Sequence, residues 1–113
     1  MRVITWNMGK ADRSRRFVKT HDLAWRFLLG LNPDLAFLQE TLPPDWVHSE
    51  GRVVRDPFEK WGSVVFSPTL PIEPFALPEG SPLHALPNYL AFAEVLLSDG
   101  SQALVASIHA PPR

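Results

Sequence analysis

The sequence contains no cysteine, which excludes disulfide bonds and metal sites built from thiolates. This absence fits a reducing compartment, and we expect a cytoplasmic protein. No run of about 18 apolar residues occurs, so no membrane-spanning helix is predicted. The first residues also lack the charged segment and long apolar core that are typical of a signal peptide, and none is expected.

Neither sign of charge dominates the sequence. It has 11 Lys and Arg against 12 Asp and Glu, and a formal net charge of -1. A basic surface that binds nucleic acid tightly by releasing counterions is therefore not indicated. A nucleic-acid substrate remains compatible with this charge, because a bound metal ion can carry the phosphate contacts locally. With 113 residues, of which 45% are hydrophobic, the chain is expected to form one domain at most.

Two short apolar runs, residues 3–8 and 35–40, organise the sequence. Each has the length of a strand and a polar side chain at its end, and a helical pattern separates them. They predict a βαβ unit, in which the two strands are parallel neighbours with their carboxyl ends at one edge. We therefore expect Asn7 and Glu40 to lie side by side. Ligands of open α/β sheets bind at that edge, and a carboxylate beside a carboxamide offers oxygen ligands that Mg²⁺ accepts.

An amphipathic helix is predicted between the two runs, starting at Asp12 or Ser14 as N-cap and ending near Gly30. Its apolar stripe repeats every three or four residues and comprises Phe17, His21, Ala24, Leu28 and Leu31. Because His21 lies on this stripe, it is interpreted as a core or interface residue rather than as a ligand.

The middle of the chain alternates short β candidates with loops. Residues 52–54 and 62–66 are predicted strands. Six prolines then recur within residues 68–88, which forbids regular structure over most of that segment. A long extended connection is favoured there over a proline-rich ligand for a partner.

The last part is predicted to be a β-hairpin. Residues 89–97 and 102–109 flank Asp99-Gly100, the preferred centre of a two-residue type I′ turn. In that register, paired residue numbers sum to 199, and Glu94 lies on the same face as His109. Glu94 could pair with His109, but a role as a partly buried structural carboxylate is favoured.

Both faces of the predicted hairpin are mostly apolar, so both should be covered. The fold class expected is α/β, with one mixed sheet of six strands and one main helix on its outer face. A single helix covers only one face. Another layer must then come from more chain, a second copy or another protein.

Four blocks, spread over the whole chain, invite a comparison with a known family. Trp6-Asn7 closes the first strand, Leu38-Gln39-Glu40 closes the second, Gly-Ser-Val-Val-Phe-Ser forms the strand at 62–67, and Ser-Ile-His-Ala-Pro stands at 107–111. Together and in this order they resemble the endonuclease/exonuclease/phosphatase superfamily. Its members include deoxyribonuclease I-like nucleases, abasic-site endonucleases, sphingomyelinases and inositol phosphatases. The Leu-Gln-Glu block, which follows Asn-Pro-Asp, is the most specific of the four.

The resemblance implies a four-layer sandwich of two sheets between outer helices, with the active site where the strand ends of the sheets meet. It implies hydrolysis of a phosphoester that depends on Mg²⁺ or Mn²⁺. By position, Glu40 matches the metal-binding glutamate of the family and Asn7 the asparagine near the metal and phosphate. His109 matches the histidine that, in the deoxyribonuclease-like branch, lies by the scissile phosphate and assists the leaving group.

The sequence also departs from the family pattern, because the Asp-x-Asn pair and the closing Asp-His pair have no counterpart in it. Residues 1–113 are therefore interpreted as the N-terminal half of such a domain, which needs its other half or a partner for activity. The alternative is a non-catalytic half-domain that pairs with itself through an uncovered sheet face as a binding or scaffold module. In residue terms, Glu40 is then a solvated loop carboxylate, Asn7 a loop cap and His109 a structural residue. The pattern leaves the substrate open among DNA, RNA, a lipid head group and a sugar phosphate.

Overall fold

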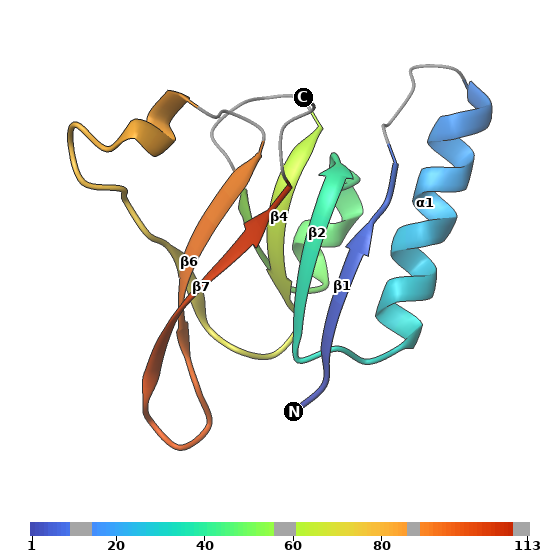
Figure 1. The fold of residues 1–113 in the computed structure, drawn as a ribbon. Helices are drawn as coiled ribbons and strands as arrows, with labels where there is room; N and C mark the ends of the chain where they lie inside the picture. The colour runs from blue at the N-terminus through green and yellow to red at the C-terminus, as the bar shows by residue number, and fades with distance from the viewer. Residues whose placement is uncertain (10–14, 56–60, 86–88, 110–113) are drawn as a thin grey trace.

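The computed structural model describes residues 1–9, 15–55, 61–85 and 89–109. Within them the chain forms one main helix and two β-sheets, of four and three strands, that are stacked in layers (Figure 1). The prediction of a mixed α/β fold with one main helix is confirmed. The prediction of a single six-stranded sheet is wrong.

The four-stranded sheet contains the predicted βαβ unit. Strand β1 (Val3–Asn7) pairs in parallel with β2 (Leu35–Thr41), and β2 pairs in antiparallel fashion with β4 (Gly62–Ser67). Strand β3 (Arg52–Arg55) pairs with the far edge of β4, so the order is β1-β2-β4-β3. The residues predicted as short strands thus form this sheet together with the two apolar runs.

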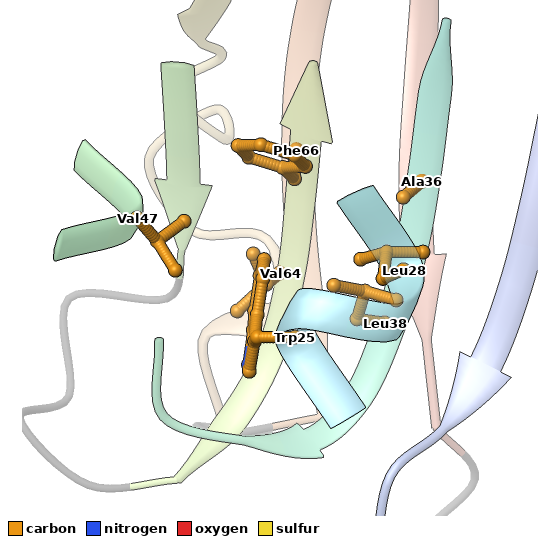
Figure 2. Packing of buried hydrophobic residues seen from close by; sticks show 7 residues of the cluster. All are labelled: Trp25, Leu28, Ala36, Leu38, Val47, Val64 and Phe66. Carbon is orange, nitrogen blue, oxygen red and sulfur yellow. The ribbon is translucent and has the colours of Figure 1, made fainter. Parts of the chain in front are cut away.

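Helix α1 (Arg15–Gly30) covers one face of the four-stranded sheet (Figure 1). Its end at Gly30 is as predicted, whereas the N-cap candidates Asp12 and Ser14 lie outside the described residues. The buried stripe differs from the predicted one, because Trp25 is completely buried and Ala24 only partly. Figure 2 shows the resulting cluster, which contains Trp25, Leu28, Ala36, Leu38, Val47, Val64 and Phe66.

A short 3-10 helix, η1 (Asp45–Ser49), packs beside α1 after the two prolines that end β2. The Trp46 indole N–H donates to Asp22 Oδ1 over 2.6 Å, and the Arg26 guanidinium lies 4.5 Å from the centre of the Trp46 ring. The Trp46 hydrogen bond and then the Arg26 hydrogen bond lower the pKa of Asp22. These contacts join η1 to the solvent side of the helix.

The second sheet has the order β5-β6-β7 and is formed by β5 (Ile72–Pro74), β6 (Leu90–Leu96) and β7 (Gln102–Ile108). It lies on the face of the first sheet that α1 leaves open, with β7 over β2 and β5 over β3. The buried residues between the sheets are Leu35, Val54, Val65, Ile72, Ala91, Ala93 and Val95. A single flat sheet would leave these side chains in water, and stacking two sheets buries them.

The proline-rich segment is mostly irregular over its described residues 68–85, as predicted, apart from β5 and the 3-10 turn η2 (Pro82–Ala85). Its course carries the chain from the first sheet to the second (Figure 1). No helix in the described parts of the chain is long and apolar enough to cross a membrane.

The β6–β7 hairpin forms with a register one residue away from the predicted one. Leu96 pairs with Gln102, and Leu97 N–H donates to the Ser101 carbonyl, so the loop has three residues. The predicted type I′ turn needs a positive φ at Asp99 as well as at Gly100. Gly100 has φ of 86°, while the non-glycine residues with positive φ in the described chain are Asn32 and Glu40.

This shift changes which side chains share a face, because neighbouring residues of a strand point to opposite faces. Ser107, and not Ile108, faces the four-stranded sheet together with Ala91. The predicted shared face of Glu94 and His109 is therefore wrong. Glu94 instead lies beside Leu104 on the outer face, where Leu96, Leu104 and Ile108 are exposed.

Candidate active site at the ends of β2 and β7

The structure brings Glu40 and His109 together from different sheets. Glu40 Oε1 lies 3.4 Å from His109 Nε2, and the two side chains are 20% and 27% exposed. Glu40 stands near the end of β2, and His109 follows β7 directly. A carboxylate and an imidazole are thus in contact with each other and with solvent, where the ends of the two sheets meet.

A β-bulge in β2 directs Glu40 toward the second sheet. Leu38 pairs with Val64 and Thr41 pairs with Gly62, so two residues of β2 stand opposite Ser63 alone. Regular alternation would place Glu40 on the helix side with Leu38. Instead Glu40 has φ of 52°, in the left-handed region, and its carboxylate contacts His109. A non-glycine residue in this conformation costs about 1–3 kcal/mol, so contacts of the surrounding structure must stabilise it.

Asn7 ends β1 beside the same edge. Its register partner on β2 is Gln39, so it lies next to the residue that precedes Glu40. The exposed side chain of Asn7 accepts a hydrogen bond from the Gly9 N–H over 2.9 Å. This contact shapes the loop after the strand, and Asn7 is not in the Glu40–His109 pair. Trp6 points to the opposite, helix-covered face and packs edge to face with Phe27 at a centroid distance of 6.2 Å.

Tyr89 is a site residue that the sequence analysis missed. Its ring is stacked on the imidazole of His109, with centroids 5.8 Å apart and planes 16° apart. The His109 N–H also donates to the Tyr89 carbonyl over 2.9 Å. The signal was available in the hairpin, because Tyr89 stands opposite His109 once the register is shifted by one residue.

A buried polar bridge joins the two sheets beside the pair. Gln39 Nε2 donates to Ser107 Oγ over 3.0 Å, and the Ser107 hydroxyl donates to the Leu38 carbonyl over 2.7 Å. Both side chains are buried. No role for either residue was evident from the sequence, and the predicted hairpin register placed Ser107 on the other face.

The residue after Glu40 is anchored to α1. The Trp25 indole N–H donates to Thr41 Oγ1 over 2.9 Å, and His21 Nε2 lies 2.7 Å from the same oxygen. All three side chains are buried, which confirms the interpretation of His21 as a core residue. The network holds the end of β2 on the helix and so fixes one side of the bulge.

We expect the stability of the protein to decrease below neutral pH because of His21. Burial lowers the pKa of His21 below its usual value of 6.5, although the Leu42 carbonyl and the charge of Asp22 oppose this shift. The unfolded chain then binds more protons than the folded one near pH 6. The contribution of His21 is therefore complete above pH 6.5 and is lost as the pH falls through the lowered folded pKa.

Urea unfolding of the wild type and of His21→Gln between pH 7.5 and 5.5 measures this contribution. The difference in unfolding free energy between the two proteins should shrink as the pH is lowered. The Asp22 and Asp99 carboxyls, whose pKa values are lowered, titrate below this window. Parallel curves for the two proteins would show that His21 is not responsible.

The donor set fits a hard divalent cation only in part. Glu40 supplies a partly exposed carboxylate and Asn7 an exposed amide, and Mg²⁺ is commonly held by one or two carboxylates with water and substrate oxygens. No group of three or more His, Asp or Glu side chains converges within the described residues. Glu40 and Asn7 are thus the residues that could hold a metal ion at this edge, and oxygens of water or of a ligand would have to complete its coordination.

The comparisons with known proteins do not name a family. No protein-family model matches the sequence, and no curated protein matches it. The resemblance of the four sequence blocks therefore stays a prediction.

Proposed function

We propose that this chain carries part of the active site of a divalent-metal-dependent phosphoester hydrolase of the nuclease or phosphatase type. The observation that carries the proposal is the contact between Glu40 and His109 at the meeting edge of the two sheets. The resemblance in sequence had assigned these two residues to one active site while they stood 69 positions apart in the chain. Their contact supports the proposal, because it puts a carboxylate and an imidazole within reach of one ligand.

In the proposed reaction, Glu40 would hold Mg²⁺ or Mn²⁺, which lowers the charge on a phosphoryl oxygen and on the leaving oxygen. Because His109 is in contact with Glu40, its imidazole would be near a phosphoester bound there, and it can donate a hydrogen bond or a proton to the leaving oxygen. Asn7, whose amide is exposed at the neighbouring strand end, would bind a phosphate oxygen. The water-activating aspartate of the family has no counterpart among the 113 residues, so the proposed site needs further groups.

The strand edges support completion of the fold by more β-structure on one side. At one side of the stack the edge strands are β3, which begins and ends in arginine, and β5, which contains Glu73 and Pro74. Charges and proline protect edges against further pairing. At the other side, β1 and β7 contain neither charged residues nor proline, and Val3, Leu104 and Ile108 are exposed there.

Hydrolysis of supercoiled plasmid and of an aryl phosphodiester, with Mg²⁺ or Mn²⁺, tests the proposed function. Glu40→Gln keeps the size of the side chain and removes its charge. We expect it to reduce the rate by about 100-fold or more, since even the partners of metal ligands contribute 10–100-fold. Glu79→Gln, at an exposed position outside the site, makes the same change of charge and should leave the rate unchanged.

Equal rates for the wild type and Glu40→Gln would contradict the proposed role of Glu40. A second candidate function, a non-catalytic module that associates with itself, is favoured by the unprotected edges of β1 and β7. Wild-type protein without activity that sediments at twice its mass of 12.7 kDa would support that candidate. Inactive monomer would contradict the self-associating module, and it would mean that residues 1–113 do not complete the proposed active site without the further groups.

A further inference from the structure

We propose that Gln39 and Ser107 form a clamp between the two sheets, which positions His109 against Glu40. The clamp is the buried bridge described above, in which the Gln39 amide donates to Ser107 and the Ser107 hydroxyl donates to the Leu38 carbonyl. Its relevance to catalysis rests on the proposed function, but its effect on the geometry of the pair does not. Gln39 and Ser107 are positioning residues in this proposal, since both are buried and a ligand bound at Glu40 and His109 would not contact them.

The clamp occupies a place where apolar side chains would be expected. Along β6 and β7, the face toward the four-stranded sheet is otherwise made of Ala91, Ala93 and Val95 with partly buried Ala103 and Val105. A hydroxyl in such an interface is unfavourable unless it is hydrogen-bonded. Ser107, 1% exposed, is the one residue of β7 that is fully buried, and it is bonded as donor and as acceptor.

The position of the clamp in each strand links it to the pair. Gln39 directly precedes Glu40, within the bulge, and Ser107 lies two residues before His109 on the same face of β7. Hydrogen bonds with distances of 2.7 and 3.0 Å therefore set the separation between the ends of β2 and β7, next to the residues that carry the pair. The Oε1–Nε2 distance within the pair is 3.4 Å, which is too long for a hydrogen bond that could hold the two strand ends by itself.

Tyr89 limits the remaining freedom of His109. The imidazole is stacked on the Tyr89 ring, and the backbone N–H of His109 is bonded to the Tyr89 carbonyl. The ring plane of His109 is thus set from its own sheet, and the distance to Glu40 is set by the clamp. Loss of the clamp should leave the stacking intact while the distance between the two side chains becomes variable.

Proton NMR of the His109 ring tests the clamp without substrate or metal. Spectra are recorded at one fixed pH in metal-free buffer. The single substitution Glu40→Gln should shift the His109 ring resonances relative to the wild type, because the two side chains are in contact. In the Ser107→Ala background the same substitution should produce a shift smaller by more than half, which is the loss of coupling expected for two groups that have separated.

Two further variants make the result specific. Gln102→Ala removes an exposed amide from the same strand and should leave the response to Glu40→Gln unchanged. Gln39→Met keeps the length of the side chain, removes the amide donor and should reduce the response as Ser107→Ala does. Gln39→Met also tests the clamp if Ser107→Ala does not fold.

A full response to Glu40→Gln in both Ser107→Ala and Gln39→Met would overturn the clamp, even if both variants were less stable than the wild type. A lower unfolding free energy alone is what a purely structural role predicts. Since the experiment uses neither metal nor phosphoester, its outcome does not depend on the hydrolysis test, and each proposal can fail without the other.

Discussion

Trp25→Ala is expected to lower the free energy of unfolding by about 3–5 kcal/mol, the usual cost of truncating a buried large aromatic side chain. Trp25 is completely buried between α1 and the four-stranded sheet, and its ring packs edge to face with Phe66 at 5.4 Å (Figure 2). The substitution also removes the indole donor from Thr41, in a buried network. For a domain at the lower end of ordinary stability, this loss approaches the whole free energy of unfolding.

Urea unfolding followed by circular dichroism measures the effect. Phe27→Ala, on the same helix but 64% exposed, is the matched control and should cost less than about 1 kcal/mol, as surface substitutions generally do. Trp25→Phe keeps one aromatic ring and loses the donor to Thr41 together with part of the buried indole, so its loss should be smaller than that of Trp25→Ala. Equal losses for Trp25→Ala and Phe27→Ala would contradict the position of α1 on the sheet.

Gly51→Ala is expected to destabilise the protein by about 3 kcal/mol, at the upper end of the range for overpacking. A Cβ at residue 51 would lie 2.6 Å from the Ser67 carbonyl oxygen and 2.8 Å from Pro68 Cα. Both are backbone atoms at the end of β4, so neither can rotate away. The substitution must push β3 and β4 apart, or shift the turn that leads into β3.

Gly30→Ala is the control for Gly51→Ala. Nothing lies within 4 Å of a Cβ at Gly30, the last residue of α1, and alanine is the better helix former. Its unfolding free energy should equal or exceed that of the wild type. If Gly51→Ala were as stable as Gly30→Ala, the close approach of β3 and β4 at residue 51 would be wrong.

Local patterns were sufficient for most elements of the fold, although not for η1, β5 and η2. The apolar runs at 3–8 and 35–40 became the parallel pair β1 and β2, and the helix between them ends at Gly30 as predicted. The prolines after Thr41 end β2, and those of 68–85 keep most of that segment irregular. These features depend on residues that are close in sequence, such as turn formers, proline and the spacing of apolar side chains.

The failures share one cause, which is that they depend on contacts between residues distant in sequence. The three-residue loop goes with a register that puts Ala103, Val105 and Ser107 of β7 on the face toward the other sheet and leaves Leu104 and Ile108 exposed. The dipeptide Asp99-Gly100, taken alone, favours a loop of two residues. Likewise, the division into two sheets follows from burying the inner face of β2 and β4, for which one helix is insufficient.

By itself the sequence determined the two strand ends that carry Glu40 and His109, since apolar runs and turn residues place each polar side chain at the end of its own strand. Only the tertiary structure decided that these two residues meet. A bulge with Glu40 in the left-handed conformation, the register of the three-residue hairpin and the stacking of the sheets were all needed to bring Oε1 and Nε2 to 3.4 Å. Each depends on packing between segments far apart in the chain, which no local pattern of residues encodes.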